Sequence, residues 1–260
     1  MAQQRDRTNA VSGFADGARY QSARPGYPVA AIAHMVEVLG IEGARRVVDV
    51  AAGTGLFTRE LVPFARDLVA VEPSAGMRHE FERQELGVAI LEGTAESLPF
   101  DSHTIDVITV AQAFHWFEYD KALAEFARVL DPEGHLGLIW NERDESVEWV
   151  AQLTTAMLWD LKRPFDAATD YAAVLADGGF REIEQRTFHH VQLVDRATLD
   201  RRVLSTSYIA VMAPDKQREI LDNVAQVVRD FDEYFEIPYV TSTYCATAPF
   251  ASGLRRQSIQ

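Results

Sequence analysis

Short apolar runs of strand length alternate with segments of helical character through the first half of the chain, and this alternation most limits the folds open to it. The runs occupy Arg46–Val50, Leu68–Glu72, Val88–Leu91, Ile105–Ala111 and His135–Trp140. Strands that are apolar throughout and joined by helices indicate a parallel sheet covered on both faces. The sequence therefore predicts an α/β fold.

The helices of this half are indicated by apolar spacing and by glycine or proline signals at their ends. We expect helices over Tyr27–Leu39, Gly53–Phe64, Pro73–Leu86 and Lys121–Leu130, and a turn at Pro132-Glu133-Gly134. Each helix except the first would connect or follow strands of the sheet.

The second half has a different pattern, with two longer strands that enclose helices. The expected helices are Val147–Leu161, Tyr171–Ala176 (stopped by Gly178-Gly179), Arg196–Ala213 and Lys216–Phe235, and the expected strands are Phe180–Leu193 and Ile237–Ala246. Because the last two helices lie between the last two strands, we interpret them as an insertion or lid.

The net charge of −14 opposes binding to nucleic acid, because an acidic surface repels phosphate over about 10 Å at moderate salt. The densest basic spots are only the pairs Arg201-Arg202 and Arg255-Arg256. No apolar run reaches the length of a membrane span, and Met1–Asn9 has no apolar core of a signal peptide. We therefore expect neither a nucleic-acid nor a membrane partner.

One cysteine, Cys245, cannot form an internal disulfide or a multi-cysteine zinc site. On a strand, His189 and His190 point to opposite faces, so they cannot chelate one metal together. We expect a cytoplasmic protein without a metal site, and the sequence leaves its oligomeric state open.

The glycine-rich segment Val47–Gly55 links a strand to a helix, where a ligand can approach the backbone closely. Ligands of parallel sheets bind at this edge, beyond the carboxyl ends of the strands.

Glu72 ends the second strand and can accept hydrogen bonds from two ribose hydroxyls. The alternative is an exposed carboxylate that caps the helix at Ser74. Thr58 stands where a dinucleotide site prefers a small residue, which disfavours an oxidoreductase, and no phosphate-binding P-loop is present.

Further motifs make the set more specific: Glu92–Phe100 and then Ile105–Ile108. The succession Asp49–Gly55, Glu72, Gly93–Phe100, Asp106–Phe117 and Leu130–Trp140 resembles the class I S-adenosylmethionine-dependent methyltransferases, in particular the type 11 branch around trans-aconitate methyltransferases. The N-terminal stretch Phe14, Tyr20 and Arg24–Pro28 strengthens the resemblance, which covers about residues 14–142 well.

The resemblance implies a Rossmann-like, doubly wound, mostly parallel seven-stranded sheet with a helical lid inserted late in the chain. It also implies a single methyltransferase domain over residues 1–260. Within it, residues 1–40 would cap the cofactor, 41–142 would form the cofactor-binding core, and 143–260 would supply the acceptor-side lid and the last strands.

The resemblance further implies that S-adenosylmethionine is the cofactor and S-adenosylhomocysteine the product. Cofactor-binding positions carried over from the family's motifs are Tyr20, Arg24, Asp49, Ala51, Gly53, Thr54, Glu72, Ser74, Met77, Thr94, Ala95, Glu96, Ala111 and Gln112. Two of them depart from the usual pattern. Ala51 replaces the first glycine of the loop and is expected to keep a negative φ, and Thr94 replaces an aspartate that often contacts adenine.

The acceptor would meet the methyl group at the aromatic cluster Ala113–Phe117. His115 is the catalytic candidate, as a base or as an orienting contact; the remaining alternative is a catalytically silent histidine. The acceptor pocket is expected to include Phe14, Phe114, Trp116, Trp140, Arg143 and Tyr208. If the acceptor is a carboxylic acid, Arg143, Arg201 or Arg202 could bind it.

We therefore expect methyl transfer to a small molecule, as O-methylation of a carboxylate or hydroxyl, with N-methylation of a small heterocycle as the alternative. Two alternatives of another class are a non-catalytic protein that binds S-adenosylmethionine and an NAD-dependent oxidoreductase.

Overall fold

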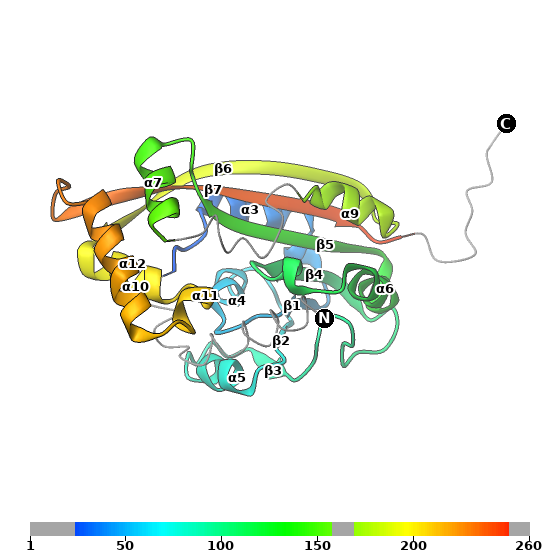
Figure 1. Cartoon of the computed structure of the whole chain (residues 1–260). Coiled ribbons are helices and arrows are strands. Elements are labelled where there is room, and N and C mark those ends of the chain that lie inside the picture. The colour runs from blue at the N-terminus through cyan, green and yellow to red at the C-terminus, as the bar shows by residue number, and fades with distance from the viewer. Residues whose placement is uncertain (1–23, 158–168, 250–260) are drawn as a thin grey trace.

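The computed structural model describes residues 24–157 and 169–249 (Figure 1). Within these residues, seven strands form one sheet in the order β3-β2-β1-β4-β5-β7-β6. Their bounds are β1 Val47–Val50, β2 Leu68–Val71, β3 Ala89–Leu91, β4 Ile105–Ala111, β5 Leu130–Arg143, β6 Arg181–Asp195 and β7 Tyr234–Thr247. Only β7 runs antiparallel to its neighbours β5 and β6, so the predicted mostly parallel, doubly wound sheet is confirmed.

Helices pack on both faces of this sheet and at one end of it (Figure 1). Their bounds are α3 Val29–Val38, α4 Leu56–Leu61, α5 Ala75–Glu82, α6 Tyr119–Val129, α7 Glu148–Ala156, α9 Tyr171–Asp177, α10 Arg196–Leu204, α11 Ser207–Ala210 and α12 Pro214–Val227, with short 3₁₀ helices η1 Ile41–Gly43 and η2 Phe114–Trp116. None of the helices in the described ranges is long and apolar enough to cross a membrane.

Successive strand residues supply two separate cores, as the two-residue period of a strand requires. Val47 faces a cluster with residues of α3 and α4, whereas Val48 faces the opposite cluster with residues of α6 and α9. The helix α3 lies so close to β5 that a Cβ on Gly137 would come within 2.7 Å of the Met35 side chain. The first half thus buries its apolar runs on both faces of the sheet.

A third core lies where α7, α10, α11 and α12 meet the ends of β6 and β7, on the left of Figure 1. It contains Leu153 of α7, Leu199 and Val203 of α10, Ile220 of α12 and Tyr239 of β7. The chain between β6 and β7 is therefore an insertion with packing of its own, as the sequence predicted.

Three sequence predictions need correction. The turn at Pro132-Glu133-Gly134 lies inside β5, because the register steps from Ile105–Leu130 to Val107–His135 and the extra residues bulge out. The helix expected over Arg196–Ala213 breaks between α10 and α11, since the hydroxyls of Ser205 and Thr206 donate to the Arg202 carbonyl and compete with helical hydrogen bonds.

The helix expected over Lys216–Phe235 ends at Val227, and Tyr234 already belongs to β7. The rings of Phe231 and Phe235 both pack against Trp149, at centroid distances of 5.0 and 6.2 Å. Tertiary packing of the aromatic rings, rather than local helical periodicity, therefore decides the structure here.

Candidate active site

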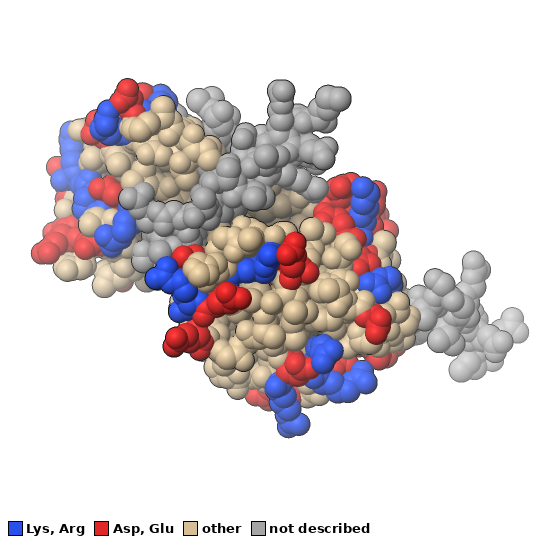
Figure 2. Space-filling view, turned by 90° about the horizontal axis from the view of Figure 1, so that it is seen from below, with Lys and Arg blue, Asp and Glu red and all other residues tan. Residues whose placement is uncertain are grey.

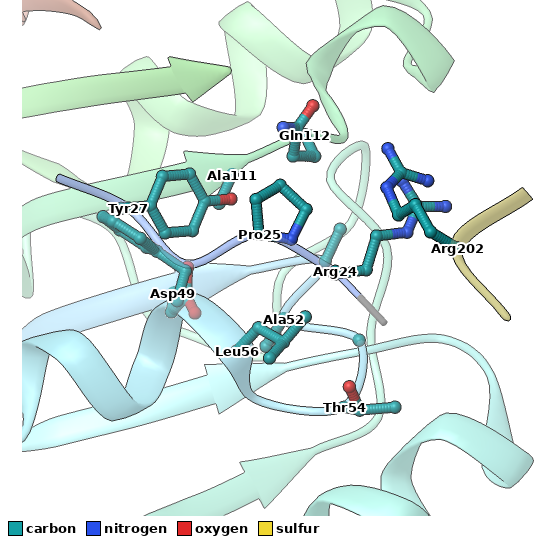
Figure 3. A pocket seen from close by; sticks show the side chains of 13 residues that line it. Arg24, Pro25, Tyr27, Asp49, Ala52, Thr54, Leu56, Ala111, Gln112 and Arg202 are labelled. Atoms are coloured by element: carbon teal, nitrogen blue, oxygen red, sulfur yellow. The ribbon is translucent and has the colours of Figure 1, made fainter. Parts of the chain in front are cut away.

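A pocket lies at the carboxyl ends of β1 and β4, where the connections leave the sheet in opposite directions (Figure 3). Such a reversal opens a crevice at the edge of a parallel sheet, the usual ligand position in this architecture. The lining residues come from four segments of the chain: Arg24, Pro25, Tyr27, Asp49, Ala51, Ala52, Gly53, Thr54, Leu56, Phe57, Ala111, Gln112 and Arg202.

Two residues that are not glycine adopt the left-handed conformation at this pocket. Ala51 follows β1 with φ 56°, and Gln112 follows β4 with φ 55°. The expectation of a negative φ at Ala51 is therefore wrong, because the turn after β1 requires a left-handed residue whether or not it is glycine. Gln112 is held by bonds from its backbone nitrogen to the Ile139 carbonyl and from its amide to the Asn141 carbonyl. Strain of this kind concentrates at ligand sites.

Asp49 presents a fully buried carboxyl group to the pocket. It accepts hydrogen bonds from the hydroxyls of Thr58, at 2.6 Å, and Thr109, at 3.0 Å. Burial raises the pKa of Asp49 to about 7, although the two hydroxyls oppose the shift. The bond also explains why a threonine occupies position 58, where a dinucleotide site would prefer a smaller side chain.

Glu72 follows β2 and is only 7% exposed, so the alternative of an exposed capping carboxylate is wrong. One carboxylate oxygen accepts from the Gly53 nitrogen, at 3.0 Å, and the other from the Ser74 nitrogen, at 2.9 Å. Burial raises its pKa, and these two bonds oppose the rise. Ser74 caps α5 by accepting from the Met77 nitrogen, and Met77 is buried. Glu72 therefore links the glycine-rich loop to the start of α5.

The segment after β3 forms a tight turn in which Thr94 pairs with Ser97. Gly93 is required there, because a Cβ would come within 2.9 Å of Val71 at the end of β2. Ala95 is buried, and the Glu96 carboxylate accepts from the Glu118 nitrogen. These residues do not line the pocket of Figure 3 but follow the strand next to Glu72.

Residues 24–28 lie over the pocket, and Arg24, Pro25 and Tyr27 line it. The Asn141 amide donates to the Gly26 carbonyl at 2.9 Å, and its carbonyl accepts from Thr241 at 2.5 Å. Asn141 therefore ties this segment to the ends of β5 and β7. The other expected N-terminal site residues, Phe14 and Tyr20, lie outside the described residues.

His115 lies in η2, beside the pocket rather than in its lining. Its Nδ1 accepts a hydrogen bond from the indole N–H of Trp140 at 3.2 Å. Burial lowers the pKa of His115 to about 4, so the ring is neutral near pH 7. Because Nδ1 accepts, the proton of the neutral ring lies on Nε2. His115 is therefore built to donate a hydrogen bond, which favours an orienting role over that of a base.

The other residues expected in the acceptor pocket are aromatic and differ in how far they are buried. Phe114 is fully buried and stacks on Tyr119, and Trp140 stacks on Tyr171 with ring centroids 4.3 Å apart. The ring of Trp116 contacts that of His115. The structure therefore places His115, Trp116 and Trp140 together beside the core that holds Phe114.

Two further expected acceptor residues lie in the second half of the fold. Arg143 donates to the Thr154 hydroxyl of α7 at 3.2 Å, and Tyr208 of α11 donates to the Met157 carbonyl at 2.8 Å. Neither lines the pocket, but both connect α7 to neighbouring elements.

Sequence reasoning missed several lining residues: Pro25, Tyr27, Ala52, Leu56 and Phe57. Leu56 and Phe57 begin α4 directly after the glycine-rich loop, so their position in the sequence could have indicated them. Arg202 was considered only for an acidic acceptor, yet it lines the same pocket as the glycine-rich loop. It lies almost 150 residues further along the chain, and no local pattern could place it there.

Comparisons with known proteins identify the family of this chain. Residues 48–138 match the family model described as a methyltransferase domain. An uncharacterized methyltransferase of Mycobacterium tuberculosis is 34% identical over 240 residues, covering 90% of this chain and 94% of the relative. A malonyl-[acyl-carrier protein] O-methyltransferase of Methylococcus capsulatus is 30% identical over 220 residues, covering 79% and 74%.

Among solved structures, a protein described as a methyltransferase from an antibiotic biosynthesis pathway of Anabaena variabilis superposes with a TM-score of 0.64. It is 20% identical and covers 86% of this chain and 98% of its own. This likeness concerns the fold. The relative that is 34% identical across nearly the whole chain shows the family: the chain belongs to the methyltransferases.

Proposed function

We propose that this methyltransferase binds S-adenosylmethionine across the carboxyl ends of β1, β2 and β3 and transfers its methyl group to a small molecule. The observation that carries the proposal is the pair of buried carboxyl groups, Asp49 and Glu72, on either side of the glycine-rich loop. With the cofactor bound in this way, residues 1–40 would form the expected cap, 41–142 the cofactor-binding core, and 143–260 the lid on the acceptor side.

The residues present fit the cofactor in three parts. The methionine part would lie in the pocket, where Asp49 faces its ammonium group and Ala51, Gly53, Ala111 and Gln112 form the walls. A buried carboxylate attracts an ammonium strongly because the low-dielectric interior screens the two charges little, which offsets their lost hydration. Arg24 would pair with the carboxylate at the other end.

The ribose would lie at Glu72, whose oxygens retain acceptor capacity beyond the two backbone bonds. Ser74 and Met77 would flank it. The adenine would lie along Thr94, Ala95 and Glu96, which follow the neighbouring strand β3.

When bound, the sulfonium supplies an activated methyl group that is transferred by in-line displacement. The chain's own task is then to align the acceptor and exclude water, for which alignment alone can lower a barrier by about 7–11 kcal/mol. Pro25 and Tyr27 cover the pocket, with the Tyr27 ring 5.1 Å from that of Phe57. His115 would orient the acceptor through its Nε2–H.

For the acceptor we propose O-methylation of a carboxylate or hydroxyl. A carboxylate needs no base, which agrees with a His115 whose lowered pKa makes it a weak proton acceptor. The O-methyltransferase of Methylococcus capsulatus supports oxygen as the acceptor atom. N-methylation of a small heterocycle is the alternative, and the assignment to the trans-aconitate branch stays a prediction.

Acidic and basic side chains are interspersed over the described part of the face shown in Figure 2. Together with the net charge of −14, this disfavours a polyanionic substrate. A cytoplasmic location also stays a prediction.

The test is calorimetric titration with S-adenosylhomocysteine, with NADH as the control ligand. Saturable micromolar binding of S-adenosylhomocysteine alone is expected, and Glu72→Gln should weaken it. Binding of NADH, or no binding of S-adenosylhomocysteine, would contradict the cofactor proposal. Acceptors would then be screened with a labelled methyl donor; binding without turnover on any acceptor class would favour a non-catalytic protein.

A further inference from the structure

Arg202 is an unusual residue for its position. It belongs to α10 of the insertion, is only 8% exposed, and lines the pocket together with the glycine-rich loop. Its Nε and Nη1 are buried and have no hydrogen-bond partner among the described residues. A buried guanidinium with unpaired N–H groups is costly, because its lost hydration is not replaced. Such an arrangement is typical of a site that is completed by an anion.

The surroundings of Arg202 are also cationic. Arg24 lines the same pocket, and Figure 3 shows the two guanidinium groups near one another at one end of it. Burial lowers the pKa of Arg143, and the charge of Arg202 lowers it further. Positive charges thus gather here in a chain whose net charge is −14. An anionic ligand would lower the repulsion between Arg202 and its cationic neighbours.

A second orphaned polar group faces the same space from the opposite side. The hydroxyl of Thr54 is buried, lines the pocket, and has no hydrogen-bond partner among the described residues. In Figure 3 it lies on the glycine-rich loop, across the pocket from Arg202. Both orphaned groups are donors to ligand oxygen atoms, and the guanidinium is the one whose charge and fork suit a carboxylate.

We propose that Arg202 binds a carboxylate group in this pocket and so couples the insertion to the methyl-transfer site. The inference rests on the proposed function. The carboxylate comes either from the amino-acid end of the methyl donor or from the acceptor. In both cases α10, which Leu199 and Val203 anchor in the core of the insertion, is held over the pocket by the ligand.

The experiment compares Arg202→Gln with Arg201→Gln. Arg201 is exposed, does not line the pocket and donates to the Thr198 hydroxyl, so the structure does not place this sequence candidate at the site, and its substitution removes the same charge. Each protein is titrated with S-adenosylhomocysteine and with 5′-methylthioadenosine, which lacks the amino-acid carboxylate. The protein loaded with S-adenosylhomocysteine is then titrated with benzoate, succinate and tricarballylate. Arg202→Lys is a third variant, which keeps the positive charge but not the two parallel N–H donors of the guanidinium.

If the donor supplies the carboxylate, Arg202→Gln weakens S-adenosylhomocysteine about 10- to 100-fold, as expected for a buried charge-assisted bond, and leaves 5′-methylthioadenosine within about twofold. If the acceptor supplies it, binding of S-adenosylhomocysteine is unchanged and binding of the carboxylates to the loaded protein is lost. Arg202→Lys should fall between wild type and Arg202→Gln, and Arg201→Gln should match the wild type.

The melting temperature without ligand separates this role from a structural one. Removing an uncompensated buried charge should leave the melting temperature unchanged or raise it, whereas loss of a structural contact would lower the melting temperature. If Arg202→Gln binds S-adenosylhomocysteine and the carboxylates as Arg201→Gln does, or only loses stability, the inference is wrong. If the wild type itself does not bind S-adenosylhomocysteine, the proposed function fails first.

Discussion

Replacing Asp49 with asparagine should stabilise the ligand-free protein while weakening cofactor binding. The carboxyl group is fully buried and its pKa is raised from 3.8 to about 7. Asparagine has nearly the same shape, and its amide can still pair with the hydroxyls of Thr58 and Thr109. The substitution therefore removes the charge with little change in packing.

The sign follows from proton linkage. Between pH 4 and 7 the folded state keeps the Asp49 proton and the unfolded state releases it, so the free energy of unfolding falls as the pH rises. A shift of about three pKa units corresponds to about 4 kcal/mol of stability. About 2 kcal/mol of it is lost between pH 5 and pH 7, and the rest of the loss above pH 5 is complete once the pH exceeds the folded-state pKa. Asparagine does not titrate and avoids this loss.

The assay is urea unfolding of both proteins at several values between pH 5 and pH 8. Other titrating groups contribute equally to both, so the difference in free energy of unfolding isolates Asp49. That difference should grow in favour of Asp49→Asn by about 2–3 kcal/mol over this range. A constant difference would refute the raised pKa. Unchanged affinity of Asp49→Asn for S-adenosylhomocysteine at pH 8 would refute the pairing with the ammonium group.

Three further substitutions test the site. Ala51→Gly removes the strain of a left-handed alanine, worth about 1–2 kcal/mol, against a glycine entropy cost of about 0.5–1 kcal/mol, so the melting temperature should rise by a few degrees; a fall would contradict the strain. Trp140→Phe removes the N–H donor to Nδ1 of His115, so the His115 pKa should rise in an NMR titration, and an unchanged value would show that the bond does not matter. Asn141→Ala releases the Gly26 carbonyl, so S-adenosylhomocysteine should bind about 5- to 10-fold more weakly by calorimetry; equal affinity would show that residues 24–28 do not close over the ligand.

Local sequence patterns predicted most of the strands and the edge of the sheet at which the pocket lies. The apolar runs predicted β1 to β5 within a few residues, apart from the bulge in β5, because burial on both faces leaves a continuous signal. The glycine-rich turn and the acidic residue at the end of β2 marked the ligand edge, since each follows a strand directly. Glu72 could therefore be named from its place after a strand, whereas Asp49 was named from the resemblance to the methyltransferases.

Only the tertiary structure decided the conformation of Ala51, the proton position on His115 and the place of Arg202. Ala51 is left-handed because the turn between β1 and α4 imposes it against the preference of the side chain. The tautomer of His115 depends on Trp140, which a different strand brings near. Arg202 reaches the pocket because the insertion folds back over β1 and β4. Local periodicity indicates which face of a helix or strand is buried, but not which distant side chains that face contacts.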